Sequence, residues 1–107
     1  MATSPTQLTL KRLRQSEDYP LIQIVERWNA FSRTRIDLFN IFDILAIDND
    51  GNTVGVQVTS KNNINARIKK IENSDALPHL RKANWTIIVE GWYKEKNKRK
   101  SIIKDIS

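Results

Sequence analysis

The chain has 107 residues, a length that suits one domain spanning residues 1–107 and disfavours a second independent core. Its 18 Lys and Arg residues outnumber 12 Asp and Glu residues, and the net charge of +6 favours a polyanionic partner, with nucleic acid first among the candidates. No cysteine is present, which excludes a disulfide framework, a thiolate zinc site and a cysteine nucleophile.

The first third of the chain is predicted to form a helix and a strand. Residues 6–16 place three leucines among basic residues, the pattern of a short amphipathic helix with a basic outer face. Residues 19–28 are rich in β-forming side chains and lack a helical period, which predicts a strand. Residues 29–35 are interpreted as a loop that exposes Arg33 and Arg35.

A β-hairpin is the clearest local prediction. Residues 38–47 and 53–59 have the composition of strands, and the residues between them, Asp-Asn-Asp-Gly-Asn, are typical of turns. A three-residue loop with glycine at its last, left-handed position fits this segment, because Gly51 follows Asn49 and Asp50. That loop pairs residue 48 with residue 52 and so fixes the register of both strands.

An aspartate interrupts the apolar run of the first hairpin strand. The register places Asp43 opposite Gln57, and Thr59 shares their face of the sheet. A buried charge is unfavourable unless it is paired, hydrogen-bonded or bound to a metal, so Asp43 is the best candidate for chemistry. The alternative is that a core arginine neutralises Asp43, and Gln57 and Thr59 alone are typical of any strand with a polar face.

The second half is predicted to contain helices and then two strands. Isoleucines at positions 64, 68 and 71 recur at helical spacing after Ser60, a helix-capping residue, and residues 76–83 are interpreted as a short helix that Asn84 ends. Residues 85–93 and 101–106 are predicted strands on either side of a basic hairpin tip at residues 94–100.

This order of elements, with acidic and polar positions on the hairpin, resembles the PD-(D/E)XK nucleases, especially the small Holliday-junction-resolvase-like members found in phages. The resemblance covers residues 6–92. It depends on Val-Glu-Arg-Trp at 25–28, Asp-Leu-Phe-Asn-Ile-Phe-Asp-Ile-Leu-Ala at 37–46 and Val-Gln-Val-Thr-Ser at 56–60. It implies an α/β fold with a restriction-endonuclease-like αβββαβ core, in which helices flank a central mixed sheet.

The resemblance also implies a divalent metal site. In the family, an aspartate early in the second core strand and an acidic residue on the third strand hold the cation. Asp43 matches the first position, Gln57 stands at the second, and Glu26 corresponds to an additional upstream carboxylate. Mg²⁺ or Mn²⁺ is the implied cofactor, and Asp43 with Glu26 suffices because Mg²⁺ often binds through one or two carboxylates plus water and phosphate oxygens. The uncharged amide of Gln57 should bind metal more weakly than glutamate.

The chain departs from the family pattern at the catalytic lysine. Thr59 stands in its place, and Lys61 and Lys69 are two alternative substitutes, neither of them preferred. Asn40 replaces a loop glycine, and asparagine tolerates left-handed backbone angles better than most residues. Asp37 has a structural interpretation as a cap or turn residue before the strand.

Several basic residues are candidate contacts to nucleic acid, although such runs are most simply the solvated face of an element. If they bind phosphates, affinity should fall steeply with salt. The candidates are Arg33, Arg35, Lys61, Arg67, Lys69 and Lys70.

Three functional hypotheses follow. The first is a metal-dependent DNA endonuclease, selective for branched DNA by family analogy and compatible with a homodimer. The second is a catalytically degenerate nucleic-acid-binding module of the same fold, because Gln57 and Thr59 replace a charged pair. The third is a basic protein-interaction factor. No apolar run reaches the ~20 residues of a membrane span and no signal-peptide core is evident, so we expect a cytoplasmic protein without a membrane segment.

Overall fold

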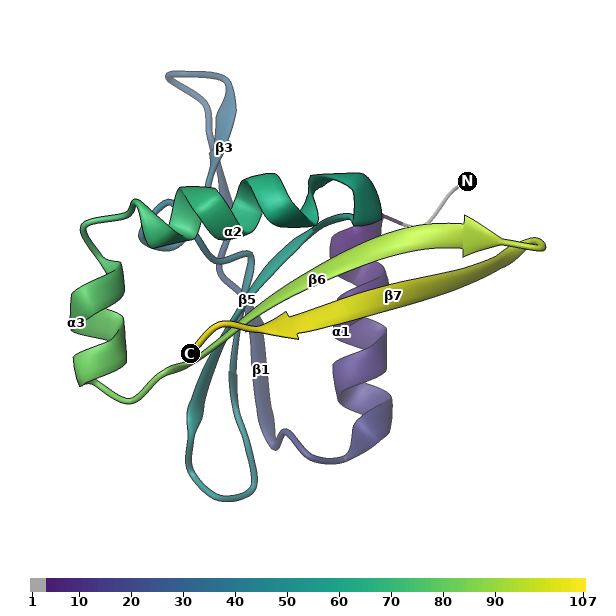
Figure 1. Cartoon of the computed structure of the whole chain (residues 1–107), viewed down its shortest axis with the longest axis horizontal. Coiled ribbons are helices and arrows are strands. Elements are labelled where there is room, and N and C mark those ends of the chain that lie inside the picture. Colours follow the sequence, from purple (N-terminus) through teal and green to yellow (C-terminus); the bar gives the residue numbers. More distant parts are fainter. Residues whose placement is uncertain (1–3) are drawn as a thin grey trace.

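The structure is a computed structural model that describes residues 4–107. It is an α/β fold in which helices flank a mixed five-stranded sheet (Figure 1). The sheet has the strand order β1-β4-β5-β6-β7, and its one parallel pair is β5 with β6. These strands are β1 (Leu21–Ile24), β4 (Ile44–Ile47), β5 (Thr53–Ser60), β6 (Thr86–Glu95) and β7 (Lys98–Asp105).

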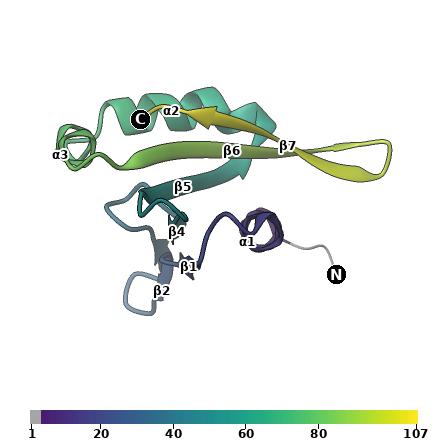
Figure 2. The ribbon, with the colours of Figure 1, turned by 90° about the horizontal axis from the view of Figure 1, so that it is seen from below.

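Two hydrophobic clusters cover the two faces of the sheet. Helix α1 (Pro5–Ser16) packs through Leu10 and Leu13 against valines of β5. Helices α2 (Ile64–Glu72) and α3 (Leu77–Lys82) cover the other face, where their apolar side chains meet residues of β6. Figure 2 shows α1 and α2 on opposite sides of the strands. Because side chains alternate along a strand, β6 contributes to both clusters, whereas the valines of β5 all face α1.

The N-terminal helix agrees with the predicted range, residues 6–16, except that it begins one residue earlier, at Pro5. The Ser4 hydroxyl accepts the Gln7 N–H at 3.2 Å, and Pro5 occupies the first turn, where it has no hydrogen bond to lose.

Arg12 on this helix donates to the fully buried Glu90 of β6 at 2.8 and 3.0 Å, and the Ser101 hydroxyl donates to the same carboxylate at 2.6 Å. Arg12, which α1 directs toward the sheet, therefore neutralises Glu90.

The predictions for residues 19–47 are wrong in detail. The predicted strand at 19–28 ends at Ile24 in the structure, and the predicted loop at 29–35 belongs to a separate hairpin of β2 (Arg27–Asn29) and β3 (Thr34–Ile36). The predicted strand at 38–47 begins only at Ile44.

The late start of β4 has a local cause. Leu38 and Phe42 exchange two backbone hydrogen bonds of 3.0 Å, which closes residues 38–42 into a tight turn. Phe39 and Asn40 adopt left-handed backbone angles, with φ of 56° and 60°. The prediction that Asn40 tolerates a left-handed backbone angle is confirmed. The turn contains residues whose apolar composition, taken alone, indicates a strand.

The register of the central hairpin is confirmed. β4 and β5 pair Ile47 with Thr53 and Ile44 with Val56, so Asp43 lies opposite Gln57 by continuation of the same register. Gly51 has the left-handed φ of 83° that the three-residue loop requires.

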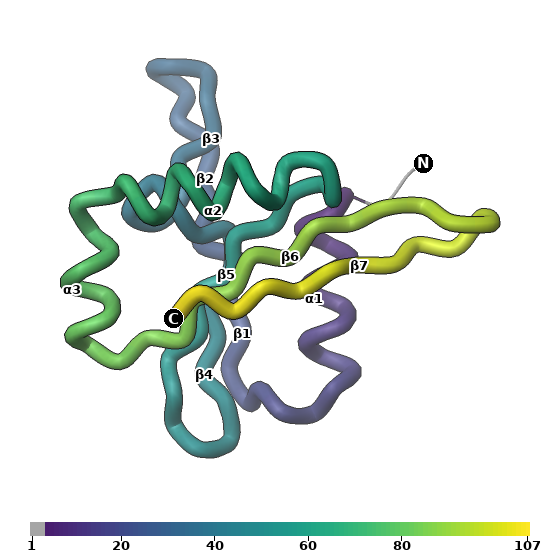
Figure 3. Tube along the Cα trace, viewed as in Figure 1, coloured from purple at the N-terminus to yellow at the C-terminus, as the bar shows by residue number. Residues whose placement is uncertain are grey.

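The second half agrees with its predicted order but not with every boundary. A 3₁₀ turn (Lys61–Asn63) precedes α2, and Asn84 ends the α3 region with a φ of 62°. β6 and β7 extend through the predicted tip, because a two-residue turn at Lys96 and Asn97, both left-handed, is enough to connect them. The two strands form a basic arm that projects from the sheet (Figure 3). Within residues 4–107, no helix is long and apolar enough to cross a membrane.

Candidate metal centre

Three carboxylates converge beside the central hairpin. Glu26, Asp37 and Asp43 each place one oxygen within 4.8 Å of the others. Asp43 is 5% exposed, and the other two side chains are half-buried. The sequence predicts that two of these residues, Glu26 and Asp43, act together, and the structure brings them together.

Backbone pairing places the first two carboxylates side by side. The Val25 N–H donates to the Asp43 carbonyl at 2.9 Å and the Glu26 N–H to the same oxygen at 3.4 Å, which continues the β1–β4 pairing past the end of β1. The Asp43 N–H in turn donates to the Val56 carbonyl at 2.9 Å. Asp43 is therefore held from both sides by the sheet.

The third carboxylate, Asp37, is not among the metal ligands predicted from the sequence. Asp37 does begin a turn, because its carbonyl accepts the Asn40 N–H at 3.0 Å, so the structural interpretation is correct as far as it goes. The same turn folds the chain back and brings the Asp37 carboxylate next to Asp43. The available signal is Asn40, a residue that tolerates left-handed backbone angles, because a turn there brings Asp37 and Asp43 close together.

Asp43 is in an environment that disfavours its ionised form. One oxygen, Oδ2, accepts hydrogen bonds from the Val58 N–H at 2.7 Å and from Gln57 Nε2 at 3.0 Å. Burial raises the pKa of Asp43 to about 8, a shift that the Val58 hydrogen bond opposes and the charge of Asp37 reinforces. Without a cation, the cluster therefore holds a proton at neutral pH. Metal binding has to displace that proton.

Gln57 adds an observation that is independent of the three carboxylates. Its side chain is 2% exposed, and its Nε2 is committed to Asp43. Its Oε1 has no hydrogen-bond partner within residues 4–107. Buried polar atoms in native proteins nearly always have a partner, and three carboxylates with an amide group hydrogen-bonded to one of them supply the oxygen ligands that Mg²⁺ and Mn²⁺ prefer. The donor set therefore fits a hard divalent cation.

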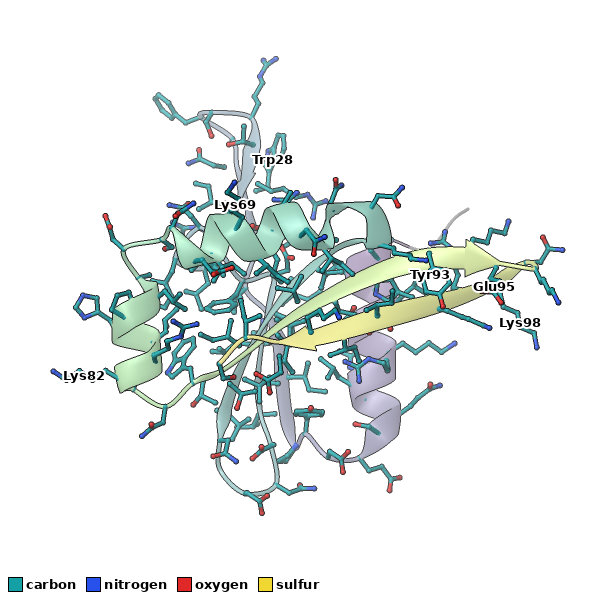
Figure 4. All side chains as sticks on the ribbon, viewed as in Figure 1. Trp28, Lys69, Lys82, Tyr93, Glu95 and Lys98 are labelled. Carbon is teal, nitrogen blue, oxygen red and sulfur yellow. The ribbon has the colours of Figure 1, made fainter. Side chains whose placement is uncertain are left out.

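The cation nearest to this cluster is an arginine. Arg35 Nη1 lies 3.0 Å from Glu26 Oε1, and the Arg35 side chain stays 69% exposed. Thr59, which the sequence resemblance places at the position of a catalytic lysine, is buried on β5. Lys61 lies in the 3₁₀ turn that follows β5, and is therefore not part of the strand that carries Gln57 and Thr59. Its Nζ lies over the Tyr93 ring, 4.7 Å from the ring centroid. Lys69 is exposed on α2 (Figure 4).

The remaining basic candidates lie on two elements. Arg67 and Lys70 accompany Lys69 on α2, where Arg67 is half-buried and Lys70 exposed. Arg33 is exposed in the β2–β3 turn, with a left-handed φ of 54°. An open groove of about 450 Å³ adjoins the cluster at Asp37. It is lined by Val25, Arg27, Ile36, Asp37, Leu38 and Phe39.

Comparison with known proteins gives no relative. No family model, curated protein or solved structure matches the chain.

Proposed function

We propose that this protein is a metal-dependent DNA endonuclease that hydrolyses phosphodiester bonds. The observation that carries the proposal is the cluster of three carboxylates whose oxygens lie within 4.8 Å of one another, with Gln57, whose buried Oε1 has no partner within residues 4–107, hydrogen-bonded to one of them, Asp43. Grouping these oxygens is unfavourable without a ligand, because the carboxylates repel one another unless one is protonated, and a bound divalent cation would offset that cost.

Glu26, Asp37, Asp43 and Gln57 are the residues that would hold Mg²⁺ or Mn²⁺. Bound there, the cation would polarise a phosphodiester and lower the pKa of a coordinated water molecule. The Val58 N–H and Gln57 Nε2 orient the Asp43 carboxylate, and the sheet holds its backbone. The groove beside Asp37 leaves one side of the site open to a substrate.

The chain also needs a positive group for the charge that develops on the phosphate. Arg35 is our first choice because its guanidinium already contacts Glu26 and is mostly exposed. Lys61 and Lys69 remain the alternatives predicted from the sequence. An arginine binds phosphate oxygens through two parallel donors and stays protonated at every relevant pH.

The topology supports the family resemblance. With the β2–β3 hairpin, the 3₁₀ turn, the short helix α3 and β7 set aside, the chain runs α1, β1, β4, β5, α2 and β6, which is the αβββαβ order of a restriction-endonuclease-like core. Asp43 directly precedes β4, the second strand of this core, and Gln57 lies on β5, the third. The net charge of +6 and the basic β6–β7 arm favour DNA as the polyanion. Branched DNA and a homodimer with paired sites follow from the resemblance.

The proposal is tested with labelled four-way-junction, flap, linear duplex and single-stranded DNA, each incubated with Mg²⁺, Mn²⁺ or EDTA. We expect cleavage only with metal, and the preferred substrate identifies the DNA structure. Arg35→Ala, Lys61→Ala and Lys69→Ala, assayed in parallel, show which cation acts, because loss of one charge-assisted phosphate contact should slow cleavage by roughly 10-fold or more. Absence of cleavage of every substrate with both metals would reject the proposal.

One observation favours a second candidate, a nucleic-acid-binding module without catalysis. Thr59 is buried where the family lysine stands, and Lys61 lies against Tyr93. This candidate predicts DNA binding that weakens with salt and does not respond to metal.

A further inference from the structure

The β2–β3 hairpin stands away from the rest of the molecule and carries exposed aromatic side chains. It projects beyond α2 at the top of Figures 1 and 3, and Figure 4 shows Trp28 on it. Phe31, in the connecting turn, is 102% exposed, and Trp28 is 61% exposed. Large exposed apolar side chains on a projecting element are unfavourable in water and are typical of a binding surface.

The turn of this hairpin has a defined conformation. Asn29 Oδ1 accepts the N–H groups of Phe31 and Ser32 at 2.9 and 3.3 Å, and the hydroxyls of Ser32 and Thr34 lie 2.7 Å apart. Arg33 adopts a left-handed angle. These contacts hold the backbone so that the Phe31 ring is presented to solvent.

The charge of the hairpin selects a polyanion over other partners. Residues 27–35 contain three arginines and no acidic residue. Trp28 and Arg35 are paired across the two strands and therefore share one face, while Arg27 lies on the other face. Aromatic rings surrounded by arginines are suited to nucleic acid, whose bases stack on the rings and whose phosphates bind the guanidinium groups.

The hairpin is also directly connected, at both ends, to residues of the proposed metal centre. Glu26 immediately precedes β2, and Asp37 immediately follows β3. Phe31 is five positions after Glu26, and at about 3.3 Å per residue the ring reaches roughly 15 Å from the cluster. That span corresponds to about four nucleotide steps at 3.4 Å each.

We propose that the β2–β3 hairpin is a wedge that inserts Phe31 between the bases of DNA at a branch or flap, a few nucleotides from the phosphate at the metal centre. This inference rests on the proposed function, because it names the substrate class of the same site. Arg27 and Arg33 hold the phosphates on either side of the inserted ring. Apolar wedges of this kind unstack base steps most easily where pairing is already interrupted.

The test uses the full chain in EDTA with DNA that carries 2-aminopurine beside a junction or flap branch point. Unstacking of this base raises its fluorescence. We expect the wild-type protein to produce the rise and Phe31→Ala to lose it, with binding weaker by about 5- to 100-fold, the range for loss of one base–aromatic stack. Phe31→Trp should restore both. Leu21→Ala, which removes a 64% exposed apolar side chain on β1, is the matched control and should behave as wild type.

Other outcomes would overturn the inference. If Phe31→Ala binds branched DNA as tightly as wild type and gives the same fluorescence rise, the hairpin is not a wedge. If sedimentation shows that Phe31→Ala converts a dimer into a monomer, and Phe31→Trp does not restore the fluorescence rise, the hairpin is a self-association arm.

The same variants separate this inference from the proposed function. A Phe31-dependent fluorescence rise without cleavage in Mg²⁺ or Mn²⁺ supports the wedge and rejects the nuclease. Metal-dependent cleavage by both proteins, with binding and a fluorescence rise that Phe31→Ala leaves unchanged, supports the nuclease and rejects the wedge.

Discussion

Replacing Asp43 with asparagine is expected to lower the rate of metal-dependent DNA cleavage about 1,000-fold, the effect of losing several kcal/mol of stabilisation by the cation. DNA binding in EDTA should be retained. The amide of the Asp43→Asn variant keeps an oxygen that can accept the Val58 N–H, which Asp43 accepts at 2.7 Å, so the local fold should persist. Single-turnover cleavage of the preferred labelled substrate in Mg²⁺ measures the effect.

The control for this substitution is Asp75→Asn. Asp75 is exposed and lies outside the acidic cluster, so its substitution changes the net charge equally without touching the site. Equal cleavage rates for wild type and Asp75→Asn are expected. If Asp43→Asn cleaves at the wild-type rate, Asp43 does not hold the cation that cuts DNA.

The second large effect is on stability. A ligand that binds only the folded state at 100 times its Kd raises the free energy of unfolding by about 2.7 kcal/mol. For a domain of this size, we expect Mn²⁺ at that concentration to raise Tm by on the order of 10 °C. The physical reason is that the cation removes the repulsion among Glu26, Asp37 and Asp43 and gives Gln57 Oε1 a partner. Thermal melts in EDTA and in Mn²⁺ measure the difference.

In the same melts, we expect Asp43→Asn to differ from wild type both in its stability in EDTA and in its response to Mn²⁺. In EDTA it should be more stable than wild type, because a neutral amide replaces a carboxyl group whose ionised form burial disfavours. Mn²⁺ should change its Tm little. An equal Mn²⁺ shift in wild type and Asp43→Asn would place the ion elsewhere in the protein.

The sequence is sufficient to predict the part of the site that depends on local rules. Gly51 determines the turn, the turn determines the register, and the register places Asp43 opposite Gln57, where the structure shows their hydrogen bond of 3.0 Å. α1 and α2 are also predictable, because their apolar residues recur at helical spacing.

Features that depend on distant contacts are not predictable in this way. Arg12 is 78 positions from its partner Glu90. The sequence therefore suggests that a core arginine pairs with Asp43, but it does not show that Arg12 pairs with Glu90 instead. The Leu38–Phe42 turn has the apolar composition of a strand, which hides the position of Asp37. The β2–β3 hairpin consists of three-residue strands, too short for an alternating pattern to be recognised.

The most direct measurement is a titration of the purified protein with Mn²⁺, with the free ion followed by electron paramagnetic resonance. We predict one saturable site per chain in wild type and loss of that site in Asp43→Asn. Gln57→Leu, which removes the unpartnered Oε1, should weaken binding by roughly 10- to 100-fold. If wild type shows no saturable site, or if both variants bind Mn²⁺ as wild type does, Glu26, Asp37, Asp43 and Gln57 do not form a metal centre.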